Sequence, residues 1–368
     1  MTDVKKGIWI VALVIVMGSL VALTWGYGML GDELEDVLQS FFESTSAPAE
    51  TVPVETVPPE TTAPGTTPGA ETTQTAPPET TMPETEAPTT LPPETTPATE
   101  PSVEVPGLTA QHAIVADLAT GETLFYKSNG TEKVYPASVT KVFTAYVALQ
   151  YLDLDQHITV GDEIDLLKRG ASRARMQKGE STTVANLIYG LFLPSGSDVA
   201  YILAAATGRE LRGSDLTAAE AVKVFVDEMN NMARDLGMTG THFAHPDGYH
   251  SGSHYTCLND LVTIAQMALR EPQIVKCTST YSIQVELDDG TLRRWTNTNQ
   301  TVNPYSGFYS KSFSGLKTGH TNNAGYCLLL AVRQDDGNYV IVGVFGCERD
   351  TNRFRDAYKL AQIFGGIE

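Results

Sequence analysis

A low-complexity stretch from Ser46 to Pro106 limits how much of this 368-residue chain is able to fold. It consists almost entirely of Thr, Pro, Glu and Ala, holds 15 of the chain's 20 prolines, and contains no lysine or arginine. Such a segment lacks the apolar residues of a core, so we expect an extended, disordered stalk. At about 3.1 Å per residue in polyproline II, it would reach roughly 190 Å. Residues 107–368 must therefore form the globular domain.

The residues before the stalk have the pattern of a membrane anchor. Residues 7–31 contain no charged side chain, and a helix of that length, at about 1.5 Å per residue, spans the roughly 30 Å hydrocarbon core of a bilayer. Lysines precede the run and an acidic juxtamembrane segment, residues 32–45, follows it. This asymmetry predicts a cytoplasmic N-terminus at residues 1–6 and a single-pass protein of the cell membrane with an extracellular domain. A cleaved signal peptide is the alternative, although the run is long for one.

Most of the negative charge belongs to the predicted tether. Residues 1–106 carry −14 of the formal net charge of −19, which leaves −5 for residues 107–368. The acidity therefore says little about a substrate. No basic patch with interleaved aromatic residues is present, so nucleic acid is not an expected partner.

The hydrophobic patterns of residues 107–368 predict strands at both ends and helices between them. Alternating patterns indicate a β-hairpin at 111–117 and 124–126 and strands at 281–287, 326–332 and 339–345. Helical spacing occurs at 142–149, 184–189, 199–206, 218–236, 258–269 and 353–364. This order favours one antiparallel sheet with helical cover, an α+β fold.

The segment from Tyr135 to Leu149 contains the first indication of chemistry. Its apolar residues recur at three- and four-residue steps, which predicts a helix entered at Pro136. Ser138 and Lys141 then lie one turn apart on the same side. A lysine placed in this way can take the proton of a serine nucleophile. The Ser-x-x-Lys pattern alone is common by chance and needs support.

Two other polar segments provide candidates for the rest of such a site. Ser195 and Ser197 lie on a turn between two predicted helices, where a hydroxyl could pass a proton within a cleft. Lys317, Thr318 and Gly319 come immediately before the strand at Tyr326, and they offer a cation, a hydroxyl and exposed backbone to a carboxylate. A second cation would also help Lys141 lose its proton. Taken singly, each segment is better explained as an ordinary turn.

Together, the three segments have the order and approximate spacing of the motifs of serine penicillin-binding enzymes and β-lactamases. From about Gln111 to its end, the chain resembles the low-molecular-mass D-alanyl-D-alanine carboxypeptidases, and the resemblance extends to His245-Pro-Asp-Gly248 and to Ala324-Gly-Tyr326. It implies a β-lactamase/transpeptidase-like antiparallel sheet with a helical subdomain, and an enzyme without a cofactor or a metal.

The resemblance also implies a role for each matching residue. The catalytic residues would be the nucleophile Ser138, its base Lys141 and the proton relay Ser195. The backbone NH groups of Ser138 and His320 would form the oxyanion hole. The substrate-binding residues would be Ser197, Lys317, Thr318, Gly319, His320 and Arg353. Arg353 would assist in holding a terminal carboxylate, with Arg349 and Arg355 as close rivals.

The second motif departs from the family's pattern at Ser197, where Asn is usual. A serine is shorter than an asparagine and offers a hydroxyl in place of a carbonyl and an NH2 group. It can keep one hydrogen bond but not the bridging pair. We expect altered substrate positioning rather than loss of the chemistry.

The resemblance therefore predicts a membrane-tethered serine D,D-carboxypeptidase. It would trim the terminal D-Ala from peptidoglycan stem peptides through an acyl-enzyme, and β-lactam antibiotics would acylate the same serine. A class A β-lactamase is one alternative, although no convincing Glu-x-x-Leu-Asn segment precedes the third motif. A catalytically weak wall-binding structural protein is another, and Ser197 favours it.

Histidines and cysteines provide two further hypotheses. Four histidines, His242, His245, His250 and His254, could indicate zinc, but they lie in a loop and lack the helical His-x-x-x-His spacing. Export would permit disulfides among the four cysteines, Cys257, Cys277, Cys327 and Cys347. A hairpin turning at Asp336-Gly337 would place Cys327 and Cys347 nearly opposite each other, and buried free thiols are equally consistent with the sequence.

Overall fold

The computed structural model describes residues 104–367. The predicted membrane run at residues 7–31, the acidic segment at 32–45 and all but the last three residues of the predicted stalk lie outside the described residues. Within residues 104–367, no helix is long and apolar enough to cross a membrane.

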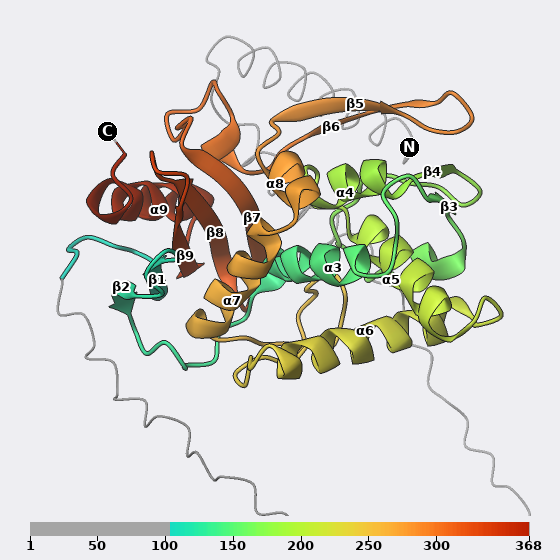
Figure 1. Cartoon of the computed structure of the whole chain (residues 1–368), viewed down its shortest axis with the longest axis horizontal. Helices are drawn as coiled ribbons and strands as arrows, with labels where there is room; N and C mark the ends of the chain where they lie inside the picture. The colour runs from blue at the N-terminus through green and yellow to red at the C-terminus, as the bar shows by residue number, and fades with distance from the viewer. Residues whose placement is uncertain (1–103, 368) are drawn as a thin grey trace, which may run out of the picture. The chain divides into compact units, whose positions relative to one another are not determined.

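Five antiparallel strands form the main sheet, in the order β2-β1-β9-β8-β7 (Figure 1). Their bounds are β1 His112–Asp117, β2 Thr123–Lys127, β7 Phe313–Thr321, β8 Gly325–Arg333 and β9 Tyr339–Cys347. The first strand of the domain therefore lies beside the last one, and β7 is left at an edge with β8 as its only neighbour.

Both faces of this sheet are buried, and the side chains of β8 show how they are divided. Leu329 and Ala331 belong to the larger hydrophobic core, which the helical subdomain completes. Leu328, Leu330 and Val332 belong to a second core beneath the C-terminal helix. The alternation follows from the two-residue period of a strand. It explains why β8 is apolar almost throughout.

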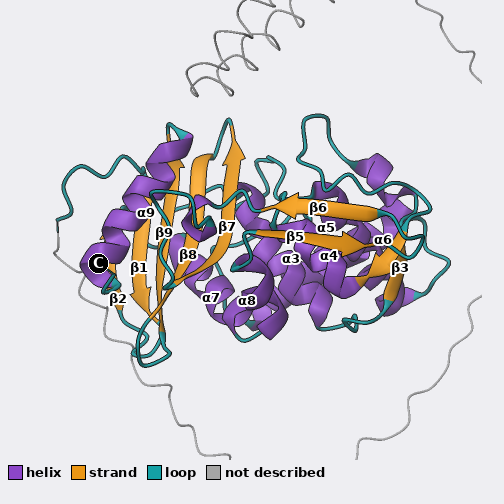
Figure 2. Cartoon of the chain, turned by 90° about the horizontal axis from the view of Figure 1, so that it is seen from above, coloured by secondary structure: helices purple, strands orange, loops and turns teal. Residues whose placement is uncertain are grey.

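The helices divide between the two faces of the sheet (Figure 2). The helical subdomain contains α3 Thr140–Leu149, α4 Val184–Phe192, α5 Ser197–Arg212, α6 Ala218–Asp235, α7 Leu258–Leu269 and α8 Pro272–Thr278. Helix α9, Asp350–Phe364, covers the opposite face. Two small antiparallel pairs complete the fold, β3 His157–Thr159 with β4 Ser181–Thr183 and β5 Ser282–Glu286 with β6 Leu292–Thr296.

Helix α9 also holds the start of the domain. Its Asp356 is buried, and one carboxylate oxygen accepts hydrogen bonds from the Thr109 backbone NH at 2.7 Å, the Thr109 hydroxyl at 2.8 Å and the Ala110 NH at 2.8 Å. Hydrogen bonds to an ionised acceptor are stronger than neutral ones. The chain entering β1 is therefore fixed to α9.

The predicted α+β arrangement is confirmed, but two parts of it were wrong. Lys317, Thr318 and Gly319 lie within β7 itself and do not form a turn before a strand. Strand β7 escaped prediction because it holds two glycines and buried polar side chains, which leave no alternation to recognise. The short elements β3, β4, β6 and α8 were also missed.

The four cysteines, all of them buried, are free thiols. Of the two states that the sequence left open, the structure has the reduced one. Cys347 lies opposite Tyr326 in the β8–β9 ladder, beside Cys327 and not across from it. Burial raises the pKa of the Cys327 thiol to about 12, so it is a core side chain and not a nucleophile.

Candidate active site

A cleft of about 630 Å³ opens between β7 and the helical subdomain. Seven of the predicted site residues line it, and they come from four separate parts of the chain: Ser138, Ser195, Ser197, Thr318, Gly319, His320 and Arg353. The two remaining predicted residues, Lys141 and Lys317, are almost completely buried beneath it. The structure therefore brings together all the residues that the three motifs nominate.

Ser138 lies on a short 3-10 turn, η1 Ala137–Val139, that runs directly into α3. This tight entry keeps Ser138 one turn before Lys141, and the Lys141 Nζ donates to the Ser138 Oγ at 3.0 Å. The same Nζ lies 3.2 Å from the Ser197 Oγ. One amine therefore connects the nucleophile segment to the second motif.

Lys141 is fully buried, and this burial lowers the pKa of its ammonium to about 8. The carboxylates of Asp247 and Asp198 act in the opposite direction and raise that pKa. An amine with a pKa near neutrality has a substantial unprotonated fraction at working pH. Lys141 is thus suited to accept the proton of Ser138.

The second motif is a turn between α4 and α5, as the sequence predicts. Ser195 has a positive φ of 59°, lines the cleft, and its hydroxyl makes no hydrogen bond to the rest of the described chain. Ser197 begins α5, and its hydroxyl, rather than that of Ser195, contacts Lys141. Ser197 therefore keeps one of the contacts expected of the usual asparagine.

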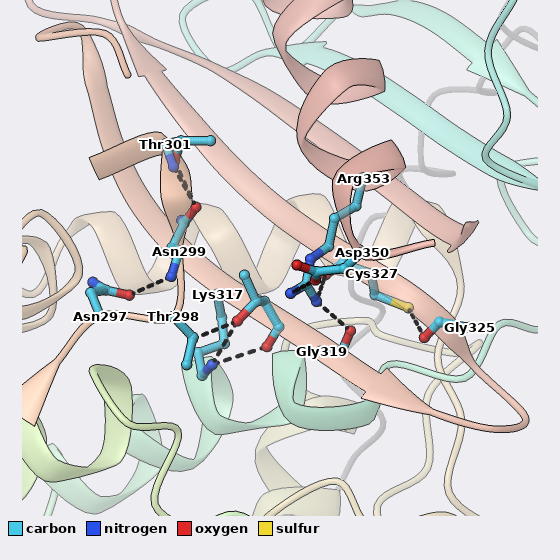
Figure 3. A network of polar contacts seen from close by, with 11 residues as sticks. Asn297, Thr298, Asn299, Thr301, Lys317, Gly319, Gly325, Cys327, Asp350 and Arg353 are labelled. Atoms are coloured by element: carbon cyan, nitrogen blue, oxygen red, sulfur yellow. Dashed lines mark hydrogen bonds and ion pairs between the residues drawn. The ribbon is translucent and has the colours of Figure 1, made fainter. Parts of the chain in front are cut away.

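Lys317 is buried in β7, and its Nζ donates to the backbone oxygen of Thr318 at 3.0 Å and to the Thr318 Oγ1 at 3.2 Å (Figure 3). The Thr318 hydroxyl also lies 2.8 Å from that of Thr298. Burial, followed by repulsion from Lys141 and Arg353, lowers the pKa of Lys317 well below its ordinary value. A bound carboxylate would relieve that repulsion, so the positive charge around Lys317 favours binding of an anion.

Arg353 reaches the cleft from α9 across the end of the sheet (Figure 3). Its guanidinium donates to the backbone oxygens of Gly319 at 3.0 Å and Cys327 at 3.4 Å, and it pairs with Asp350. Its two rivals lie elsewhere. Arg355 is exposed and is 3.7 Å from Asp356, and Arg349 is an exposed residue that precedes α9.

Two glycines let other backbone segments approach the nucleophile. A Cβ on Gly319 would lie 2.9 Å from the Pro136 oxygen and 3.2 Å from the Ser138 nitrogen. A Cβ on Gly248, which has a φ of +83°, would lie 1.9 Å from the Ala137 oxygen. Strand β7 and the loop after Pro246 are therefore packed against the turn that presents Ser138.

Backbone strain is concentrated at the three motifs. Among the described residues, five that are not glycine have a positive φ. Three of them belong to or precede a motif: Ala137 before Ser138, Ser195 itself, and Leu316 before Lys317. Such conformations cost on the order of 1–3 kcal/mol each and are typical of functional sites.

The four clustered histidines do not form a metal centre. Both ring nitrogens of His254 have protein partners, since Nε2 lies 2.8 Å from the Thr140 Oγ1 and Nδ1 accepts the backbone NH groups of Ala244 and His245. Its burial lowers its pKa to about 3, so the ring is neutral. Within residues 104–367, no group of three or more side chains is placed to hold a metal ion.

The sequence did not single out four residues that the structure places in or beside the cleft. Thr298 and Arg169 line it, Asp247 lines it and acts on Lys141, and Asp198 lies buried behind Ser197. Asp247 lies within the stretch from His245 to Gly248 that carries the family resemblance, and Asp198 directly follows Ser197, but nothing in their spacing indicated a relation to Lys141. No local signal marked Thr298 or Arg169.

Comparison with known proteins identifies the family. The profile of the D-alanyl-D-alanine carboxypeptidase peptidase family matches residues 99–348. The chain belongs to this family. A D-alanyl-D-alanine carboxypeptidase from Streptomyces sp. (strain K15) is 34% identical over 268 residues, which cover 70% of this chain and 88% of that protein.

Solved structures agree with this assignment. The Streptomyces K15 DD-transpeptidase superimposes with a TM-score of 0.64 at 32% identity, and the match covers 72% of this chain and all of that one. Penicillin-binding protein D2 from Listeria monocytogenes, solved in an ampicillin-bound form, gives a TM-score of 0.57 at 26% identity, with coverage of 71% and 99%. The protein is therefore a serine-type D-Ala-D-Ala carboxypeptidase, a hydrolase.

Proposed function

We propose that this enzyme removes the terminal D-Ala from peptidoglycan stem peptides, with Ser138 as nucleophile and Lys141 as general base. The observation that carries the proposal is the 3.0 Å contact between the Lys141 Nζ and the Ser138 Oγ at the floor of the cleft. Because the pKa of Lys141 is lowered, its amine can lose its proton and then accept that of Ser138 across this contact.

The placement of these groups supports the following course of acylation. The neutral amine of Lys141 takes the proton of the Ser138 hydroxyl while the Ser138 Oγ bonds to the carbonyl carbon of the penultimate D-Ala. The backbone NH groups of Ser138 and His320 would stabilise the resulting oxyanion. The proton then passes from Lys141 to the nitrogen of the departing D-Ala, with the Ser195 hydroxyl in the cleft as the expected relay. Water attacks the acyl-enzyme in a second step and restores Ser138.

The terminal carboxylate of the substrate would be held by Lys317, Thr318 and Arg353. The proposal is supported by the crowding of two buried cations at one end of the cleft, a cost that an anion offsets. β-Lactams present a carbonyl and a carboxylate in a similar relation. They are therefore expected to acylate Ser138 in the same orientation.

Transfer of the acyl group to an amine is a second candidate reaction. It is favoured by the likeness to the structure described as a DD-transpeptidase. Hydrolysis and transfer share the acyl-enzyme, so the roles of Ser138 and Lys141 are the same in both. For turnover of the β-lactamase type, by contrast, the described cleft offers no glutamate among its lining residues.

A fluorescent penicillin and a D-Ala-D-Ala pentapeptide together test the proposal. The wild-type protein should show covalent labelling and a pentapeptide shortened by one D-Ala, and Ser138→Ala should abolish both. Intact mass identifies the adduct. A folded wild-type protein that neither takes the label nor releases D-Ala would refute the function.

We further propose that residues 7–31 anchor the enzyme in the cell membrane and that residues 46–106 extend as a stalk. The support is the uncharged run and the Thr-, Pro- and Glu-rich composition, respectively. Deleting residues 1–45 should move the protein from the membrane fraction to the soluble fraction with its penicillin labelling intact. Retention of the deleted protein in the membrane fraction would contradict the anchor.

A further inference from the structure

A short basic segment borders the cleft on the side of the helical subdomain. Residues 168–175 contain Lys168, Arg169, Arg173 and Arg175 and no acidic residue. All four side chains are exposed, and within the described chain none of them has a hydrogen bond or an ion pair. The preceding carboxylates are engaged elsewhere, since Asp162 and Asp165 pair with Lys178 and the buried Glu163 lies 3.7 Å from Arg209. The segment is therefore an uncompensated positive strip on a domain whose net charge is −5.

The backbone of this basic segment is fixed although its arginines are free. The buried Asp198 accepts the Ala174 NH at 2.8 Å and the Met176 NH at 3.1 Å. The indole NH of Trp295 donates to the Ala174 oxygen at 3.0 Å. Arg173 and Arg175 alternate with the buried Ala174 and Met176, so they project to solvent from an immobilised backbone.

The basic segment is also joined directly to the second motif. The Ser197 NH donates to the Ser172 oxygen at 2.8 Å, and the Ser172 hydroxyl donates to the Ser195 oxygen. Arg169, Gly170, Ala171 and Ser172 then form part of the cleft lining. Arg169 therefore presents a guanidinium at a cleft whose other wall already contains the predicted anchor for the terminal carboxylate.

We propose that Arg169, supported by Arg173 and Arg175, binds an internal carboxylate of the stem peptide. This inference rests on the proposed function, and it names the class of substrate preferred at the same site. Two carboxylates lie upstream of D-Ala-D-Ala in such peptides, the α-carboxylate of a γ-linked D-Glu and, in some, a side-chain carboxylate on the third residue. Both also occur as amides, which a guanidinium binds less well because the charge-assisted, bidentate pairing is lost.

A set of matched pentapeptides tests the subsite. One peptide carries both internal carboxylates, a second is amidated at the γ-linked D-Glu, and a third is amidated on the side chain of the third residue. Release of D-Ala is measured for the full-length wild type, Arg169→Gln, Arg169→Lys, and the control Arg333→Gln, which changes an exposed arginine at the end of β8 outside the cleft lining.

The wild type should prefer the peptide with both carboxylates by about five- to tenfold in kcat/KM over one of the amidated peptides, the magnitude of a charge-assisted contact at an exposed rim. Arg169→Gln should abolish that preference, Arg169→Lys should keep part of it, and Arg333→Gln should leave it unchanged. If release of D-Ala from one amidated peptide is not slowed by Arg169→Gln, the carboxylate that this peptide lacks is the one that Arg169 binds. Added salt should weaken the wild-type preference.

Penicillin labelling separates failure of this inference from failure of the proposed function. Arg169→Gln should still form the covalent penicillin adduct, because the carboxylate of a penicillin corresponds to the terminal one, and the control Arg333→Gln should be labelled at the wild-type rate. Equal losses on all three peptides, or no loss on any, with labelling retained in the wild type would overturn the subsite and leave the enzyme function standing. Absence of both labelling and D-Ala release in the wild type would overturn the function itself.

Discussion

The two walls of the cleft use buried cations in opposite ways. On the wall formed by β7 and α9, burial and then repulsion from Lys141 and Arg353 lower the pKa of Lys317 well below its ordinary value. On the helical wall, Lys141 is equally buried, but Asp247 and Asp198 hold its pKa at about 8. The carboxylates therefore distinguish two lysines that are alike in burial.

This difference suits one wall to binding an anion and the other to transferring a proton. A lysine surrounded by cations and tied to Thr318 gains most by meeting an anion. A lysine balanced by carboxylates and touching two serine hydroxyls can exchange a proton near neutral pH. Substitutions that remove either lysine, or the charge beside it, test the division.

The largest effect is expected from Lys141→Met, which removes the base and keeps the side-chain volume. Acylation by a fluorescent penicillin should fall by about 10²–10⁴-fold, the usual contribution of a general base. Lys223→Met, an exposed lysine of α6, is the control and should acylate at the parental rate. An acylation rate of Lys141→Met within a fewfold of the parent would mean that another group takes the proton.

The same variant should be more stable than the parent. Lys141 keeps its proton up to pH about 8 when folded and up to about 10.5 when unfolded. The folded state thus binds fewer protons between these values, and parental stability should rise with pH across that window. Below this window the buried ammonium of Lys141 lowers the free energy of unfolding by on the order of 3 kcal/mol. Thermal unfolding of Lys141→Met at neutral pH should show a higher Tm, and a lower one would contradict a costly buried ammonium.

A smaller effect is expected from Lys317→Met, on the binding wall. It should raise KM for the pentapeptide by roughly 10- to 100-fold, the scale of a lost buried charge-assisted contact. It should also reduce the preference for a free terminal carboxylate over its amide. Steady-state release of D-Ala from both peptides measures this, with Lys311→Met, an exposed lysine shortly before β7, as the control. An unchanged preference would show that Lys317 does not hold the carboxylate.

Ser197→Asn should have a modest effect, because the parental serine already contacts Lys141. Restoring the asparagine usual in the family should raise acylation by a pentapeptide by about threefold to tenfold, as expected for one added hydrogen bond to substrate. Single-turnover rates measure it. Equal rates would show that the serine positions substrate as well as the asparagine does.

Asp247→Asn is expected to give the smallest change in rate but a defined change in pH dependence. Asp247 raises the pKa of Lys141, so its neutralisation should move the rise of acylation with pH to lower pH. The control is Asp335→Asn, at an exposed position in the β8–β9 turn, which should keep the parental profile. A shift in the opposite direction would contradict the assignment of Lys141 as the titrating base.

The sequence predicted the parts of the site that depend on local spacing. Ser138 and Lys141 are three residues apart on one segment, and the fold class follows from apolar periodicity in elements such as β8 and α6. The structure was needed where contacts join distant residues, as for Asp247 beside Lys141. It was also needed for β7, where the polar residues Lys317 and Thr318 are buried at the edge of the cleft. Strands are recognised by alternating apolar and polar residues, and β7 lacks that alternation.

The attachment of Thr109 and Ala110 to Asp356 has a mechanical consequence. Tension applied to the chain upstream of Thr109 would be transmitted first through these hydrogen bonds into α9 and through β1 into the centre of the sheet. Two strands, β9 and β8, separate β7 from β1, and the helical wall with Ser138 lies on the far side of the cleft from β7. A pull at this end would therefore be borne by the scaffold before it could disturb the spacing of the nucleophile and its base.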